Sequence, residues 1–76
     1  LDQGRYQRAS AAYAEALALE PEYADAWINL ASAHLQLGQN ERAIEAYQRA
    51  LRLELDASIR ARVERQLAAL QAETGR

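Results

Sequence analysis

The sequence matches itself when it is shifted by 34 residues. Glycine, alanine, tyrosine and leucine positions all coincide in this comparison: Gly4 with Gly38, Ala9 with Ala43, Ala12 with Ala46, Tyr13 with Tyr47, Ala16 with Ala50, and Leu17 with Leu51. A period of this length is typical of solenoids, in which one supersecondary unit recurs and each unit packs on the next. The chain is therefore predicted to fold as a stack of similar units.

The units are predicted to be helical. Alanine, a strong helix former, is abundant, and Pro21 is the only proline. Turn signals lie at residues 20–22, 38–40 and, more weakly, 54–56. We expect an all-α fold, a short α-solenoid of antiparallel helix pairs, with four helices near residues 5–19, 23–37, 41–54 and 57–73. Asn40 and Asp56 are the expected N-caps of the last two helices.

Apolar and small residues indicate which helix faces pack together. At about 100° per residue, they gather on one side of each of the last three helices. The residues expected in the core are Trp27, Leu30, Ala31, His34 and Leu37 in the second helix, Ala43, Ile44, Tyr47, Ala50 and Leu51 in the third, and Ile59, Val63, Leu67 and Leu70 in the fourth. Trp27 and His34 are accordingly interpreted as packing residues.

Length and composition exclude several classes of protein. A chain of 76 residues has room for one small domain. It has no cysteine and one histidine, which excludes disulfides and any metal site built from thiolates or several imidazoles. A net charge of -2 and a pI of about 5.3 disfavour nucleic acid and anionic membranes as partners. No apolar run approaches the ~18 residues of a bilayer span, so we expect a soluble chain, and its compartment stays open.

No combination of residues predicts catalysis, and we expect neither an enzyme activity nor a cofactor. His34 lies on the apolar face of its helix, and Ser32 points about 200° round the helix from it. Glu41 and Glu45 share a face with Arg49, which follows Glu45 at the spacing that suits a surface ion pair. The glycines stand alone rather than in a phosphate-binding loop.

The period and its motif resemble the tetratricopeptide repeat, whose pattern is W-x₂-L-G-x₂-Y, then A-x₃-F, then P. This chain has Trp27-x₂-Leu30-Ala31-x₂-His34, then Ala43-x₃-Tyr47, then Leu55, and an earlier partial copy with Gly4, Ala9-x₃-Tyr13, Ala16 and Pro21. Ala31, His34 and Leu55 stand where the family has glycine, tyrosine and proline. The resemblance implies a partial repeat over residues 1–23, a complete repeat over 24–57 and a C-terminal capping helix over 58–76.

A polar stripe runs along the second helix, opposite its core side. The resemblance assigns this stripe and its apolar flanks to the concave groove of the repeat array, which makes the candidate peptide-binding residues Asp25, Ile28, Asn29, Ser32, Leu35 and Gln36. Asn29 stands where chaperone-binding family members use an asparagine to hold a peptide backbone. The basic residues that clamp a terminal carboxylate in those members have no match here. Plain solvent exposure of the stripe is the alternative.

The first and the fourth predicted helices each carry a surface that bears on possible partners. Residues 5–19 carry small and apolar side chains on more than one side of the helix, so we expect upstream chain or a second copy in a homodimer to cover them. Arg60, Arg62 and Arg65 are interpreted as a solvated face of the fourth helix, with a salt bridge to an acidic partner as the alternative.

The predicted function is a non-catalytic scaffold that binds a peptide or protein segment on its concave face. Two alternatives stay open, namely self-assembly of identical chains and an accessory region of a larger enzyme. Neither nucleic acid nor a membrane is expected as a partner.

Overall fold

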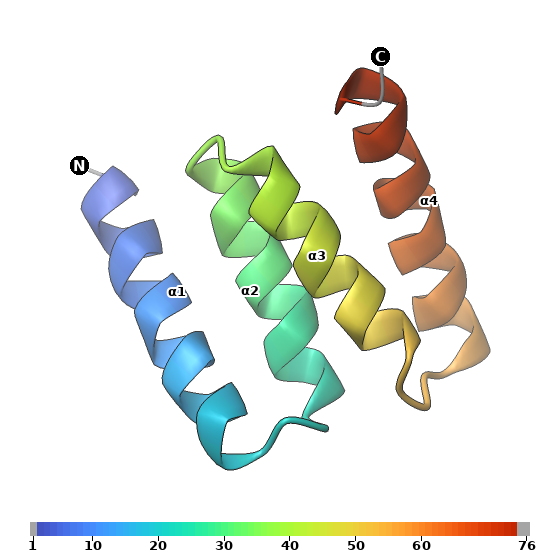
Figure 1. Cartoon of the computed structure of the whole chain (residues 1–76), viewed down its shortest axis with the longest axis horizontal. Coiled ribbons are helices and arrows are strands. Elements are labelled where there is room, and N and C mark those ends of the chain that lie inside the picture. The colour runs from blue at the N-terminus through green and yellow to red at the C-terminus, as the bar shows by residue number, and fades with distance from the viewer. Residues whose placement is uncertain (1, 75–76) are drawn as a thin grey trace.

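The computed structural model describes residues 2–74, which form four helices and no strand. The helices are α1 (Asp2–Leu19), α2 (Ala24–Gln36), α3 (Asn40–Leu51) and α4 (Ala57–Thr74). Each helix runs antiparallel to the one before it and packs on it, so the four stand in chain order (Figure 1). The fold is therefore all-α and built as a short helical repeat, as the 34-residue period predicts.

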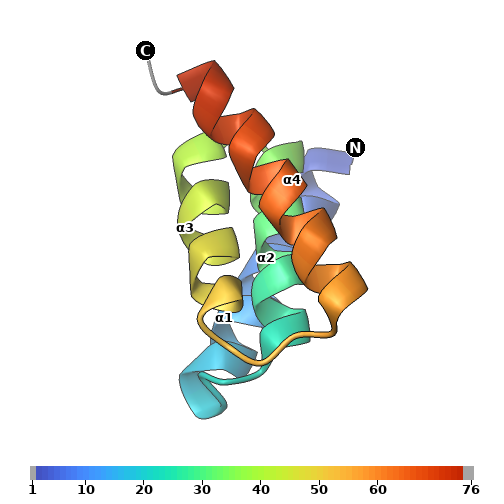
Figure 2. The same cartoon turned by 90° about the vertical axis from the view of Figure 1, so that its right-hand side faces the viewer.

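Small residues are the most deeply buried part of the core, between α2 and α3. Ala31 of α2 and Ala43 and Ala50 of α3 are completely inaccessible to solvent. Alanine lets two helix backbones approach closely, and the larger side chain of Tyr47 fills the space beside them. α4 packs on the open side of α3 with its buried Val63 and lies nearest the viewer in Figure 2.

The predicted core faces are confirmed. Leu30, Ala31, Ala43, Tyr47, Ala50, Val63 and Leu70 are buried, and Trp27, His34, Leu37, Ile44, Leu51, Ile59 and Leu67 are half-buried. The prediction missed Ala26 and Ala33 of α2 and Ala46 of α3, which are also buried. They were missed because α2 and α3 each lie between two helices and are therefore covered on two sides.

Trp27 lies at the margin of the core. Its ring is half-buried and packs against the core cluster, while its indole Nε1–H donates a hydrogen bond of 2.8 Å to the carbonyl of Pro21. The guanidinium of Arg49 lies 5.3 Å from the ring centroid, within the range of a cation–π contact. These contacts tie the loop before α2 to α3.

The turn between α2 and α3 explains why Gly38 is glycine. Its φ of 74° lies in the left-handed region that other residues rarely adopt. The N–H of Gly38 donates to the carbonyl of Leu35 at 3.0 Å, and the N–H of Gln39 donates to that of His34 at 2.8 Å. This pair of bonds is the Schellman motif, which satisfies the last carbonyls of a helix.

Several predicted helix ends need correction. α1 begins three residues earlier than predicted, because Gly4 is helical and does not form a turn as Gly38 does. Asn40 is not an N-cap, because it is the first residue of α3, and Gln39 precedes it without a side-chain cap. Asp56 does stand just before α4, where its carbonyl accepts from the N–H of Arg60 at 2.8 Å.

α3 ends at Leu51, three residues before the predicted end, and Arg60 occupies the space beyond it. The Arg60 guanidinium reaches back from α4 and donates to the carbonyls of Leu51 at 3.2 Å and Leu53 at 2.9 Å. A cation at a helix C-terminus also complements the helix dipole. Arg60 is half-buried in this position, so its interpretation as part of a solvated face was wrong.

Candidate functional site

The polar face of α2, defined by Asp25, Ile28, Asn29, Ser32, Leu35 and Gln36, lies at the molecular surface. Its four polar side chains are exposed, and Ile28 and Leu35 are half-buried. The helix holds these side chains in a row because residues three and four apart occupy the same face. The face therefore combines hydrogen-bonding groups with apolar flanks on a rigid element.

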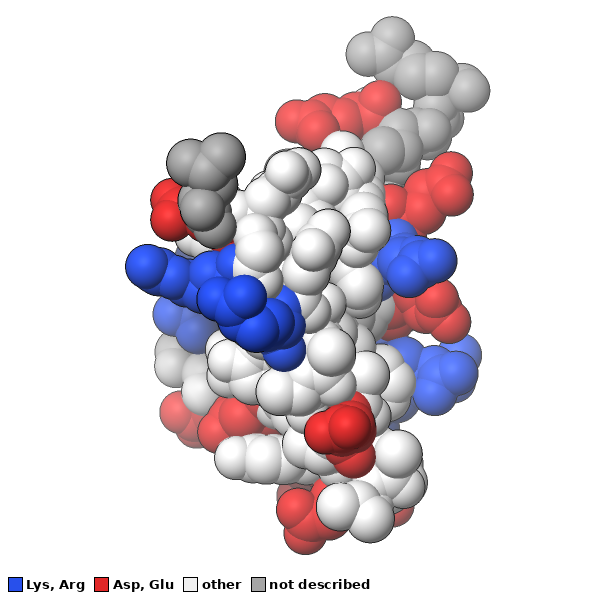
Figure 3. Space-filling model, turned by 90° about the vertical axis from the view of Figure 1, so that its left-hand side faces the viewer, with Lys and Arg blue, Asp and Glu red and all other residues white. Residues whose placement is uncertain are grey.

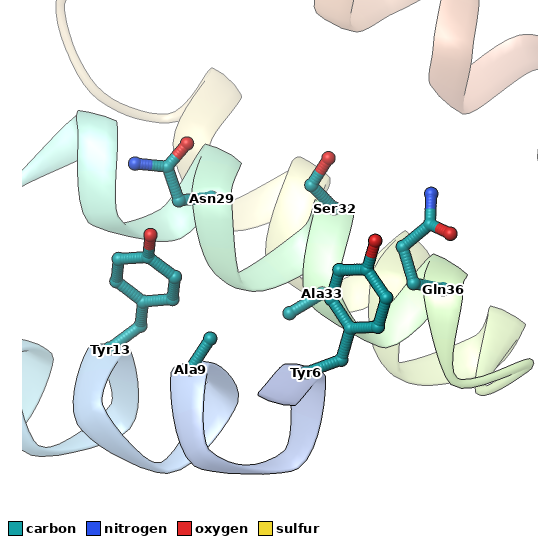
Figure 4. Close-up of a pocket in the computed structure, with 7 residues that line it drawn as sticks. All are labelled: Tyr6, Ala9, Tyr13, Asn29, Ser32, Ala33 and Gln36. Atoms are coloured by element: carbon teal, nitrogen blue, oxygen red, sulfur yellow. The ribbon is translucent and has the colours of Figure 1, made fainter. Parts of the chain in front are cut away.

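A pocket of about 280 Å³ lies on one side of this face, between α1 and α2. It is lined by Tyr6, Ala9 and Tyr13 from α1 and by Asn29, Ser32, Ala33 and Gln36 from α2. Figure 4 shows both tyrosine rings rising from α1 with their hydroxyl groups directed the same way as the polar ends of the α2 side chains. The pocket thus has aromatic and small walls with a polar rim.

A second pocket, of about 230 Å³, lies on the other side of the polar face, between α2 and α4. It is lined by Ile28, Asn29, Ser32, Tyr47, Arg62, Val63 and Gln66. Asn29 and Ser32 line both pockets, so they form a ridge between them. Asp25 and Leu35 line neither of the two.

Tyr47 lies at the floor of the α2–α4 pocket and is 5% exposed. Burial raises the pKa of Tyr47 above its usual value of 10.0, while the positive charge of Arg62 and a hydrogen bond with the Ser32 side chain act in the opposite direction. The phenol therefore carries its proton at neutral pH. Side chains of α2, α3 and α4 meet at this pocket, because Ser32, Tyr47 and Arg62 all line it.

Five residues that line these pockets were not predicted from the sequence, namely Tyr6, Tyr13, Tyr47, Arg62 and Gln66. The period itself contained a signal for two of them. Arg62 stands 34 residues after Ile28, and Gln66 stands 34 after Ser32, so both occupy on α4 the positions that the polar face occupies on α2.

His34 lies outside both pockets. Its Nδ1–H donates a hydrogen bond of 2.7 Å to Oε1 of Gln39, in the turn that follows α2. The side chain is half-buried, and the bond gives it a local structural partner. Within residues 2–74, no three His, Cys, Asp or Glu side chains are grouped so as to hold a metal ion.

Other hollows have larger volumes. Two are bends of the chain, at the α1–α2 turn, formed by residues 20–23, and at the start of α4, formed by residues 54–56 with Arg60, and they present no convergent side chains from separate helices. A third, of about 400 Å³, lies between α2 and α3 on the side of α2 opposite the polar face, and is lined by Trp27, Leu30, His34, Arg42, Glu45 and Ala46. In the described part of the chain, no helix has the length and apolarity that a bilayer span requires.

Comparison with known proteins agrees with the helical repeat. The family model described as Tetratricopeptide repeat matches residues 1–58. No curated protein matches the chain. Tetratricopeptide repeats generally mediate interactions between proteins, and they typically act as non-catalytic scaffolds. With more than half of its residues matched and its helices packed in repeat order, the chain belongs to the tetratricopeptide repeat family.

Proposed function

We propose that this chain is a non-catalytic scaffold that binds a peptide or protein segment along the polar face of α2. The observation that carries the proposal is the exposed ridge of Asn29 and Ser32 between two pockets. Asn29 has an amide that both donates and accepts hydrogen bonds, which is what a peptide backbone requires. The residues that hold the segment are Asp25, Ile28, Asn29, Ser32, Leu35 and Gln36.

The two pockets suit an extended segment. Successive side chains of an extended chain point to opposite sides. Neighbouring side chains can therefore enter the α1–α2 and α2–α4 pockets while the backbone between them meets Asn29. The ridge belongs to a helix that is packed on both sides, so little of its conformational freedom is lost on binding.

An array of short N-acetylated peptides, probed with the purified chain, tests this function. The peptides that bind best are then titrated against Asn29→Ala and against Gln48→Ala, a control on the exposed face of α3. Loss of one backbone hydrogen bond should weaken binding to Asn29→Ala about five-fold. Equal affinity for both variants, or no peptide bound by the wild-type chain, would contradict the proposal.

A second candidate function is self-association through α1, and a comparison within the chain favours it. Ala46 of α3 is 2% exposed, whereas its counterpart Ala12 of α1 is exposed. Leu19, at the end of the same helix, is 84% exposed. Figure 3 shows the face that α1 presents, with uncharged surface between a basic group and acidic groups.

The charges on α1 also suit a second copy. Arg5 and Arg8 outnumber Asp2 in its N-terminal half, and Glu15 lies in its C-terminal half. An antiparallel pair of α1 helices would place each basic end beside the acidic end of the other copy. Sedimentation over a range of concentrations should detect dimers, and Ala12→Glu should remove them while the exposed control Ala61→Glu does not. A monomer at every concentration would exclude this candidate.

A further inference from the structure

The α2–α4 pocket is rich in hydrogen-bond donors. Arg62 is the one charged residue in its lining, and neither aspartate nor glutamate lines it. Asn29 from α2 and Gln66 from α4 each bring an amide NH₂ group. Three side chains from two helices therefore offer donors to the same small space.

The hydroxyl groups at the floor add to this set. Ser32 and the buried Tyr47 both line the pocket, and each carries a hydroxyl group. A hydroxyl has one donor and two acceptor sites, so Ser32 keeps capacity for a ligand as well. Ser32 is exposed, which leaves that capacity accessible from the groove.

The size and the walls of the pocket narrow the choice of ligand. A volume of about 230 Å³ is several times the ~30 Å³ that one water molecule occupies in the liquid. The aliphatic side chains of Ile28 and Val63 form part of the wall. An aliphatic wall beside clustered hydrogen-bond donors suits a ligand side chain with a short methylene stem and an anionic end.

We propose that this pocket binds the carboxylate of an aspartate or glutamate side chain in the segment held along the polar face of α2. The inference rests on the proposed peptide-binding function. Arg62 carries one positive charge, which balances one carboxylate but not a doubly charged group. Because the chain as a whole carries a net charge of -2, its overall field repels acidic peptides, and a preference for them requires a local site of this kind.

An array of random short peptides tests the inference. The peptides are N-acetylated and attached to the support through their C-termini, so side chains are the only source of carboxylate. The array is probed with the wild-type chain, Arg62→Gln, and Arg65→Gln, which removes the same charge from an exposed position on the same helix. Thermal unfolding of each variant establishes that it is folded.

Acidic residues should be enriched among the peptides that bind the wild-type chain and Arg65→Gln, and this enrichment should disappear with Arg62→Gln. Replacing the enriched glutamate by glutamine in one peptide should weaken binding to the wild-type chain roughly ten-fold and leave binding to Arg62→Gln unchanged. The charge reversal Arg62→Glu should shift the preference toward lysine and arginine.

The outcomes separate the two proposals. If peptides bind with no acidic preference, or if Arg62→Gln keeps the wild-type preference, the carboxylate pocket is refuted while peptide binding stands. If the wild-type chain binds no peptide, the proposed function fails and the pocket fails with it. An enrichment lost equally in Arg62→Gln and Arg65→Gln would indicate a general charge effect and would also overturn the inference.

Discussion

At the scale of single residues, Ala43 controls how closely α2 and α3 approach. Its side chain is 0% exposed and belongs to the core cluster with Leu30, Ala31 and Tyr47. A closely packed core accommodates added methylene groups only by shifting side chains or backbones. The cost of a larger residue at this position therefore measures the fit between the two helices.

Ala43→Leu should lower the free energy of unfolding by about 1–3 kcal/mol, because the added side chain pushes α2 and α3 apart. The control is Ala61→Leu, at an exposed position of α4. Chemical denaturation of the two variants and the parent measures the difference. A midpoint for Ala43→Leu equal to that of the parent would contradict the close approach.

Tyr47 should make stability depend on alkaline pH. Burial raises its pKa in the folded state above that of the unfolded chain, where a tyrosine titrates near 10. As the pH rises past about 10, the tyrosine ionises in the unfolded chain before it ionises in the folded one. The free energy of unfolding therefore falls as the pH rises from the unfolded-state pKa to the higher folded-state pKa. Urea midpoints between about pH 9 and 11 should fall less steeply for Tyr47→Phe than for the exposed control Tyr23→Phe. Equal slopes would show that Tyr47 does not cause the decline.

Helical periodicity is sufficient to place Asn29, Ser32 and Gln36 at the surface, because the face of a helix on which a residue lies follows from its position in the sequence of that helix. It is not sufficient to pair these residues with Tyr13 or Arg62. That pairing depends on which helix packs beside α2 and at what angle, and these are properties of the whole stack. The binding role of the face is not tested by its exposure and stays a prediction.

At the scale of helices, the number and order of the elements follow from the period, but their ends do not. The predicted end of α3 was wrong because Arg60 lies nine residues after Leu51 and hydrogen-bonds to its carbonyl. The predicted start of α1 was wrong because Gly4 and Gly38, although related by the period, have different conformations. Neither the Arg60 contact nor the difference between the two glycines leaves a local pattern in the sequence.

The two glycines should respond to the same substitution with opposite signs. Gly4→Ala should stabilise the chain by about 0.5–1 kcal/mol, because alanine is the better helix former and its Cβ would lie 3.7 Å from the flexible end of Arg8. Gly38→Ala should destabilise it by about 1 kcal/mol, because the φ of 74° disfavours any residue with a Cβ. Thermal unfolding compares them, and changes of the same sign would contradict the assigned conformations.

At the scale of the whole molecule, the two end helices have fewer neighbours than the two middle ones. α2 and α3 each pack between two helices, whereas α1 packs chiefly on α2 and α4 chiefly on α3. In a solenoid, stability is approximately a sum of contacts between neighbours, so an end with one neighbour should open more readily. The side of α1 that faces away from α2 therefore remains a candidate interface.

Amide hydrogen exchange should therefore be faster in α1 than in α3 when the chain is dilute. If α1 associates with a second copy, its protection should increase with protein concentration while that of α3 changes little. Hydrogen exchange followed by mass spectrometry at two concentrations measures both effects. Equal protection of α1 and α3 in a dilute monomer would show that α1 needs no cover.

The central claim is that ligands meet the polar face of α2 and not its opposite side. Trp27 and His34 line a hollow on that opposite side, between α2 and α3. Nuclear magnetic resonance titration of the ¹⁵N-labelled chain with an array-selected peptide tests the claim directly. We predict that the side-chain amide signals of Asn29 and Gln66 shift with added peptide, while the indole N–H of Trp27 stays in place. A shifted Trp27 signal with those of Asn29 and Gln66 unchanged would contradict the account.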